Sequence, residues 1–202
     1  MLVRRTCVKA RKQTRRVMLQ RGLDILSKQG IEGLTVDGLC SRLGLTKGAF
    51  YHHFQGRSQF HAALLEYWME RSTEAKKALA DQKGSAEERY AQIVDYASNL
   101  PHDQEKAIRA WALHSPLAAE YQAKVDASRR QYLEELLKDM LPNPDQAEDM
   151  ATLVLAAMIG LRHLFPAVCG EARQELMRRL HGLMGVRLVY PGGDDNEILE
   201  GC

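Results

Sequence analysis

The chain has 202 residues, enough for one large domain or for a small domain followed by a medium-sized one. Its formal net charge of +2 conceals an asymmetry, because residues 1–57 hold 12 Lys and Arg against 3 Asp and Glu, whereas the remainder holds 16 against 23. The longest apolar run, residues 153–161, is far shorter than the roughly 20 residues needed to cross a bilayer. No apolar segment follows the basic start of the chain, so we expect neither a secretory signal nor a membrane anchor.

The four cysteines are far apart in the sequence and form no CxxC pair. Together with the expected lack of a signal, this predicts a reduced protein located in the cytoplasm. We interpret Cys40 as a small core residue. Cys169 is either a redox sensor or an inert thiol near a helix end, and we favour the inert thiol.

The first predicted helix covers residues 12–29 and is preceded by a basic arm, residues 1–11. Gly30 ends this helix, because glycine readily adopts the left-handed conformation found just beyond a helix. The inward-facing residues of the helix are predicted to be Val17, Met18, Leu23, Ile25 and Leu26.

A short second helix is predicted to begin after Thr35, whose hydroxyl can accept a backbone N–H that the helix start leaves unpaired. Val36, Leu39 and Leu43 recur at helical spacing and form one apolar face. Gly44 follows the last of them, where a left-handed residue would end the helix and turn the chain.

A third short helix is predicted to begin after Thr46, which can cap it as Thr35 caps the second. Phe50 and Phe54 lie one turn apart and would anchor this helix in the core. Gly48 lies inside the helix, where glycine costs about 1 kcal/mol relative to alanine. That cost is acceptable where the backbone must approach another surface closely, so residues 35–54 fit a helix-turn-helix whose second helix enters the major groove of DNA.

Residues in and after this segment resemble those of the TetR family of bacterial transcription regulators. The matching positions are Gly44, Gly48, Tyr51, the pair His53-Phe54, and Arg57. The resemblance covers roughly residues 12–71 and is specific, because several constrained positions agree at once. It implies an all-α protein with a three-helix DNA-binding head, residues 12–72. A long helix would join this head to an α-helical effector-binding and dimerisation domain, residues 73–190.

The resemblance also implies a set of DNA-contacting residues. They are Thr35, Thr46, Lys47, Gly48, Ala49, Tyr51, His52, His53 and Arg57. Lys47 and Ala49 would meet base edges, because an ammonium donates to guanine acceptors and a methyl group contacts thymine. Tyr51, His52 and Arg57 would hold phosphates, as would the two capping threonines. The basic arm and the start of the first helix would add salt-sensitive attraction, in the minor groove if the arm enters it.

The roles of some residues in this segment allow more than one interpretation. His53 either binds a phosphate or packs the head, and Tyr51 is alternatively a partly buried aromatic residue of the core. Asp37 would face the DNA, where its charge repels phosphate, and only a base contact or a solvated cap would account for it. The net charge of +9 through Arg57 is typical of a nucleic-acid-binding end, and it is also typical of a solvated basic tail.

Six more helices are predicted, for a total of about nine. They cover about residues 58–84, 85–99, 102–114, 117–141, 145–164 and 171–188, with Pro101, Pro116 and Pro142 between them. The ending, residues 191–202, is glycine-rich and acidic and is expected to be flexible.

Helices 145–164 and 171–188 are predicted to form a homodimer interface. The first is apolar nearly all round, so every side of it needs cover. Its small residues Ala156, Ala157 and Gly160 allow close approach, and in the resembled family the corresponding helices form a four-helix bundle with a second subunit. The alternative is that this helix is the buried centre of a monomer. The second helix offers an apolar face made of Leu176, Leu180, Leu183 and Met184.

The resemblance implies a small-molecule effector bound in the C-terminal domain. Candidate lining residues are Trp68, Tyr96, Trp111, His114, Tyr121, Met158, Arg162, His163 and Phe165. Trp111 and His114 are three residues apart and are expected to share a helix face. Arg162 and His163 would line the pocket, pair across the dimer or reach solvent.

No enzyme motif is found, the histidines are too scattered for a metal site, and no cofactor is expected. The sequence therefore predicts a ligand-responsive repressor that binds a palindromic double-stranded operator as a homodimer. The alternatives are a helical carrier or scaffold with a vestigial head, and a redox switch working through Cys169 or Cys40. The operator, the regulated genes, the effector and the choice between repression and activation stay open.

Overall fold

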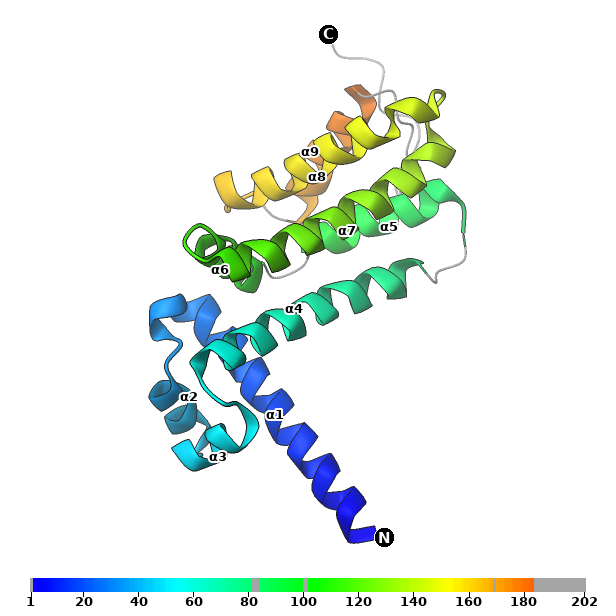
Figure 1. The fold of residues 1–202 in the computed structure, drawn as a ribbon. Helices are drawn as coiled ribbons and strands as arrows, with labels where there is room; N and C mark the ends of the chain where they lie inside the picture. Colours follow the sequence, from blue (N-terminus) through cyan, green and yellow to red (C-terminus); the bar gives the residue numbers. More distant parts are fainter. Residues whose placement is uncertain (1, 81–83, 100–101, 169, 184–202) are drawn as a thin grey trace. The chain divides into compact units, whose positions relative to one another are not determined.

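The structure is a computed structural model that describes residues 2–80, 84–99, 102–168 and 170–183, and within these ranges it is all-α, as predicted. Figure 1 shows the helices in chain order. They are α1 (Leu2–Gln29), α2 (Val36–Leu43), α3 (Lys47–His53), α4 (Arg57–Ala80), α5 (Ala86–Asn99), α6 (Asp103–Ala112), α7 (Pro116–Met140), α8 (Ala147–Leu164) and α9 (Gly170–Leu183). Two short 3₁₀ turns, η1 (Ile31–Gly33) and η2 (Pro144–Gln146), precede α2 and α8. In these ranges no helix combines the length and hydrophobicity that a membrane span requires.

The chain divides into two compact units. The first unit comprises residues 1–74 and 101–126, and the second unit comprises residues 75–100 and 127–202. The first unit therefore contains α6, which the sequence assigned to the C-terminal domain. The physical reason is that Ile108 and Trp111 of α6 are buried in the same apolar cluster as Leu26 of α1 and Phe60 of α4.

The core of the first unit surrounds a group of three phenylalanines. Phe50, Phe54 and Phe60 are at most 3% exposed, and their ring centroids lie 5.0–5.4 Å apart. Helix α2 packs against α1 and α3 (Figure 1), and its Cys40 is buried, as expected for a core residue. Val17 is 40% exposed, so its predicted inward orientation is wrong. It directly precedes Met18, which is buried at 1% exposure.

Helix α1 approaches α4 closely at a glycine. A Cβ atom on Gly22 would lie 2.9 Å from Cζ of Phe60 and 3.0 Å from Cδ1 of Leu64, closer than real Cβ contacts permit. Only glycine therefore fits this crossing without a shift of its neighbours. The helix also begins at Leu2 rather than near Lys12, so the predicted basic arm is continuous with it.

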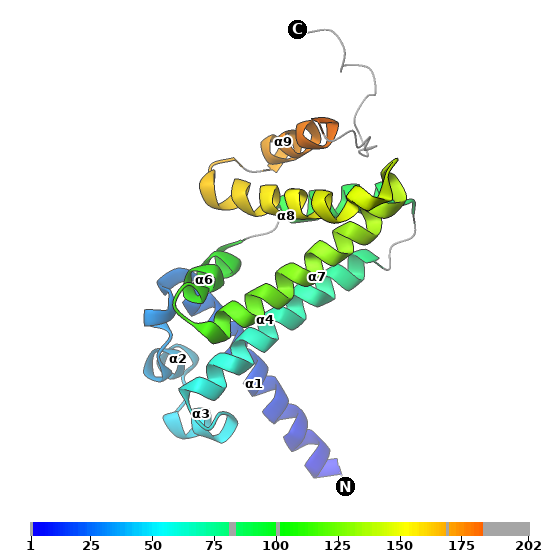
Figure 2. The same cartoon turned by 45° about the horizontal axis from the view of Figure 1, so that its top comes forward.

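The second unit is built from α5, the part of α7 after Asp126, α8 and α9. Helix α9 packs against α5 and α8, and Figure 2 shows it beside α8. Its core includes Tyr90 of α5, Leu137 of α7, Val154 of α8 and Met177 of α9, each at most 1% exposed. Cys169, the end of the predicted ninth helix beyond Leu183, and the tail of residues 191–202 lie outside the described residues.

Candidate nucleic-acid interface

Both short helices of the first unit begin at a threonine cap, as predicted. The Thr35 hydroxyl accepts from the backbone N–H of Gly38 at 3.0 Å, and the Thr46 hydroxyl accepts from that of Ala49 at 3.1 Å. A Cβ at Gly38 would lie 2.9 Å from Oγ1 of Thr35, so a glycine at this position leaves room for the cap. This role of Gly38 was not predicted from the sequence.

The turn between α2 and α3 is set by Gly44, which has the predicted left-handed conformation with φ 63° and ψ 31°. Its N–H and that of Leu45 donate to the last carbonyls of α2, with Leu45 N 2.9 Å from O of Cys40. These bonds fix the angle at which α3 leaves α2. The orientation of α3 therefore follows from the local sequence.

Helix α3 buries one side and exposes the other. Phe50 is fully buried, whereas Lys47, Gly48, Tyr51 and His52 are exposed and follow one another at i, i+1, i+4 and i+5. We call these four residues the reading face. The side chain of Tyr51 is 56% exposed, which argues against its alternative reading as a core aromatic.

Ala49 and His53 lie at the edges of the reading face and are half-buried. The His53 ring lies 6.3 Å from the Phe54 ring, and the His52 ring lies 5.4 Å from the His53 ring. His53 thus contacts the core while keeping part of its surface open.

An ion pair joins the beginnings of α2 and α3. Nζ of Lys47 lies 2.8 Å from Oδ1 of Asp37, and the two side chains are 65% and 69% exposed. The hydrogen bond and the charge of Asp37 raise the pKa of Lys47. The ion pair is a third role for Asp37, besides the base contact and the solvated cap expected from the sequence. The pair could have been anticipated from the motif, because both residues lie in the first turns of two helices whose starts the turn brings together.

Arg57 is the first residue of α4 and is exposed, and its Nε donates to Nε2 of His61 at 3.4 Å. The His61 ring in turn lies 5.0 Å from the Trp111 ring of α6 in an edge-to-face arrangement. Burial and the neighbouring charge of Arg57 lower the pKa of His61 to about 4, so at neutral pH its Nε2 can accept this bond. His61 was missed from the sequence because its partner Trp111 is 50 positions away.

The effector candidates fall in both units. Trp68, Trp111, His114 and Tyr121 belong to the first unit, and Tyr96, Met158, Arg162, His163 and Phe165 belong to the second. The expected shared face of Trp111 and His114 is wrong, because α6 ends at Ala112. Trp111 is consequently buried and His114 exposed.

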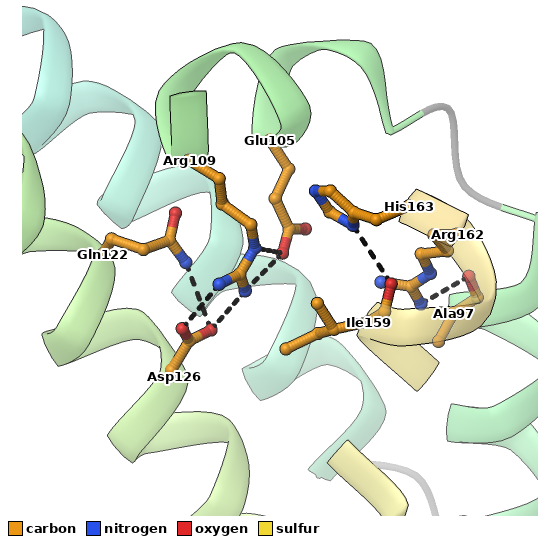
Figure 3. Close-up of polar contacts among 8 residues, drawn as sticks. All are labelled: Ala97, Glu105, Arg109, Gln122, Asp126, Ile159, Arg162 and His163. Atoms are coloured by element: carbon orange, nitrogen blue, oxygen red, sulfur yellow. Dashed lines mark hydrogen bonds and ion pairs between the residues drawn. The ribbon is translucent and has the colours of Figure 1, made fainter. Parts of the chain in front are cut away.

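In the first unit, a polar cluster links α6 to α7 (Figure 3). The Arg109 guanidinium donates two hydrogen bonds to Asp126, at 2.6 and 2.9 Å, and two to Glu105, at 2.9 and 3.2 Å. Burial opposes its charge, but the hydrogen bonds and charges of these two carboxylates raise the pKa of Arg109. Gln122 donates to Asp126 at 3.1 Å, while its buried Oε1 has no hydrogen-bond partner among the residues that the structure describes.

In the second unit, Arg162 is 6% exposed and donates to the carbonyl of Ala97 at 2.8 Å (Figure 3). Its neighbour His163 is exposed, with Nδ1 3.0 Å from the carbonyl of Ile159. Of the three roles predicted for these two residues, reaching solvent therefore applies to His163 and not to Arg162.

Two capped helices on a phenylalanine core, with a polar face on the second helix, form a helix-turn-helix motif, which is typical of DNA-binding domains. Residues 18–64 match the family model of the bacterial regulatory proteins of the tetR family. An uncharacterized HTH-type transcriptional regulator of Pseudomonas putida, TtgW, is 33% identical over 64 residues, which are 32% of this chain and 47% of that protein. The match thus spans about half the length of this curated relative.

Two solved structures share the fold over most of the chain. A transcriptional regulator from Rhodococcus sp. Rha1 has a TM-score of 0.72 at 23% identity, covering 87% of this chain and 98% of that one. A Saccharomonospora viridis protein described as a transcriptional regulator, solved in complex with choline, has a TM-score of 0.73 at 13% identity, covering 85% and 96%. The family match is thus confined to residues 18–64, whereas the likeness to the solved structures shows the fold over most of the chain.

Proposed function

We propose that the protein is a sequence-specific DNA-binding transcriptional regulator that inserts α3 into the major groove. The observation that carries this proposal is the reading face, because its polar and small residues are exposed while Phe50 holds the opposite side of α3 in the core. The family match over residues 18–64 and the net charge of +9 through Arg57 support it.

The residues of the interface divide into two groups in this proposal. Lys47 and Ala49 meet base edges and so supply sequence preference. Tyr51, His52 and Arg57 bind phosphates, which positions the domain without reading the sequence. The hydroxyls of Thr35 and Thr46 also contact phosphate, in addition to capping their helices. His53 packs the head, which its half-burial beside Phe54 favours over a phosphate contact.

We further propose a homodimer through α8 and α9. Leu153, Leu164 and Phe165 are 55–73% exposed, and Leu176 and Leu183 of α9 are 42% and 88% exposed. Ala156 is also exposed, and a Cβ on Gly160 would meet no atom within 4 Å. Several large exposed apolar side chains on two helices that contact each other are typical of a protein interface. A second copy of the same helices would cover them, and the dimer would supply the two reading faces that a palindromic operator requires about 34 Å apart, one turn of DNA.

Input from a small molecule completes the proposal. The Saccharomonospora neighbour was solved with choline, so a small effector is proposed for this chain as well. In the first unit, Trp111 of α6 contacts His61, and His61 accepts from Arg57. An effector that moves α6 would therefore change the position of a phosphate-binding side chain, and DNA would in turn change effector affinity. We propose repression as the output, because a dimer on a promoter blocks polymerase.

The test is selection of bound fragments from genomic DNA of the source organism by the purified protein, in parallel with the Tyr51→Ala, Arg57→Ala double variant. We expect the native protein alone to enrich one inverted-repeat sequence. Failure of the native protein to enrich any sequence at low salt would contradict the proposal and favour a helical carrier or scaffold with a vestigial head.

A further inference from the structure

The ion pair between Asp37 and Lys47 places a carboxylate at the proposed DNA surface, where phosphate would repel it. We infer that Asp37 is a specificity-determining residue of this site. It positions the Lys47 ammonium for base recognition and prevents that ammonium from attracting phosphates of any sequence. The inference rests on the proposed DNA-binding function and extends it to a residue on the helix that precedes α3.

The geometry of the pair is set by the backbone. Asp37 lies in the first turn of α2 and Lys47 is the first residue of α3. The caps at Thr35 and Thr46 and the left-handed Gly44 fix both helix starts, and the two charged atoms come within 2.8 Å of each other. A lysine ammonium has three N–H donors, so one bond to Asp37 leaves two for the O6 and N7 acceptors of guanine.

The exposure of the pair argues against a role in folding. Both side chains are more than 60% exposed, and exposed ion pairs add little to stability. Holding a long lysine side chain in one orientation does, however, reduce the entropy lost when the side chain binds. Asp37 therefore contributes more to recognition than to the fold.

Charge explains why the pair favours specificity. Binding to DNA of any sequence comes from lysines and arginines that neutralise phosphates and release counterions. The Asp37–Lys47 pair has a net charge of zero, so it attracts a phosphate only weakly. The remaining N–H donors of Lys47 can still bond the acceptors of the correct base. Pairing thus lowers affinity for random DNA while keeping affinity for the correct site, and the ratio of the two affinities rises.

The test compares Asp37→Asn with Glu32→Gln. Glu32 is an exposed carboxylate in η1, outside the Asp37–Lys47 pair, so its neutralisation controls for the loss of one negative charge. Dissociation constants are measured for a duplex enriched by the native protein and for a shuffled duplex of the same composition, at several salt concentrations. Thermal unfolding is followed in parallel.

We expect Asp37→Asn to bind the shuffled duplex roughly threefold to tenfold more tightly and to steepen the salt dependence by about one phosphate contact. Discrimination between the duplexes should fall roughly tenfold, the order of one base contact. Glu32→Gln should change discrimination much less. In a Lys47→Ala background, Asp37→Asn should leave discrimination unchanged, because the residue through which it acts is gone.

Three results would overturn the inference. The first is an equal change in discrimination for Asp37→Asn and Glu32→Gln. The second is a lower unfolding temperature for Asp37→Asn with unchanged discrimination, which would assign Asp37 to the helix dipole of α2 instead. The third is that the native protein binds both duplexes equally. That result would contradict the proposed DNA-binding function itself, and it would be seen with the native protein before any variant is measured.

Discussion

Glycine occurs at three positions of the helix-turn-helix for three different physical reasons. Gly44 is left-handed, with φ 63°, and ends α2. Gly38 leaves room for the Thr35 hydroxyl, 2.9 Å from where its Cβ would lie. Gly48 has neither reason, because it is helical and its Cβ would meet only Oγ1 of Thr46, at an ordinary contact distance of 3.7 Å. Neither the backbone conformation nor the packing within the chain requires a glycine at this exposed helical position. We therefore expect that the backbone of α3 approaches another molecule closely at Gly48.

We therefore predict opposite effects of Gly48→Ala on stability and on DNA binding. The variant should gain about 0.5–1 kcal/mol of unfolding free energy, because alanine is the better helix former. It should lose about 1–3 kcal/mol of binding free energy for the selected duplex, since an added methyl group separates two closely packed surfaces. Urea unfolding and fluorescence anisotropy measure the two quantities. Unchanged DNA affinity would show that α3 does not approach DNA closely at this residue.

At the residue scale, sequence predicts what depends on neighbouring residues. The caps at Thr35 and Thr46 and the left-handed Gly44 were predicted because each uses partners within five positions. The Asp37–Lys47 pair and the Arg57–His61–Trp111 contacts were not predicted. The first pair and the Arg57–His61 bond lie within ten and four positions and depend on side-chain orientations that periodicity does not give. Only the contact of His61 with Trp111 depends on where distant helices come together.

At the element scale, the crossing of α1 and α4 is held at Gly22, whose missing Cβ leaves room for Phe60 and Leu64. Gly22→Ala should lower the unfolding free energy by about 1–3 kcal/mol through overpacking. The same substitution at Gly48 should raise it, so the two variants control for each other in one urea titration. Equal, stabilising effects of both would contradict the close packing at Gly22.

Helices α5 and α9 are joined by a buried hydrogen bond between the Tyr90 hydroxyl and Nε2 of His181, 2.6 Å apart. Burial lowers the pKa of His181 from 6.5 to about 4, so the folded state holds this ring neutral. Between pH 6.5 and about pH 4, His181 is protonated in the unfolded chain but stays neutral in the folded chain. The free energy of unfolding is therefore fully present above pH 6.5 and decreases as the pH falls towards 4.

From this shift we predict that the contribution of His181 lowers the free energy of unfolding by about 2 kcal/mol when the pH falls from 7 to 5. His61 of the first unit, whose pKa is also lowered to about 4, should act in the same direction. Urea unfolding of the native protein and of His181→Gln at both pH values isolates the His181 contribution. The variant should be less stable at pH 7 and show a smaller loss at pH 5. A loss equal to that of the native protein would refute this role of His181.

The helices themselves were predicted well, because their apolar periodicity and proline boundaries are local signals. Three features were not. Helix α1 begins at Leu2, Val17 is exposed, and α6 shares a core with α1 and ends before His114. The core that α6 shares with α1 depends on packing between segments that are distant in the sequence, to which a periodicity pattern is insensitive.

At the scale of the whole molecule, the proposed function requires a second copy of the chain, bound through α8 and α9. Leu153 and Leu164 are 57% and 73% exposed on α8, so replacing both with glutamate should leave the fold intact. We predict that this variant loses about 2–4 kcal/mol of dimerisation free energy and sediments as a monomer at concentrations where the native protein is dimeric. Leu113→Glu is the matched control, because Leu113 is 79% exposed and lies in the first unit.

A control variant that also becomes monomeric would show that charge alone disrupts association. A native protein that sediments as a monomer at micromolar concentration would contradict the proposed interface directly.

The central claim is that α3 reads DNA sequence, and the most direct test is the ratio of dissociation constants for a shuffled duplex and the enriched duplex. For the native protein at physiological salt we predict a ratio of at least about 10³. Lys47→Ala should lower the ratio, because it removes a base contact, whereas Arg57→Ala should weaken both duplexes alike and leave the ratio unchanged. A native ratio near one, or equal ratios for the native protein and Lys47→Ala, would contradict reading by α3.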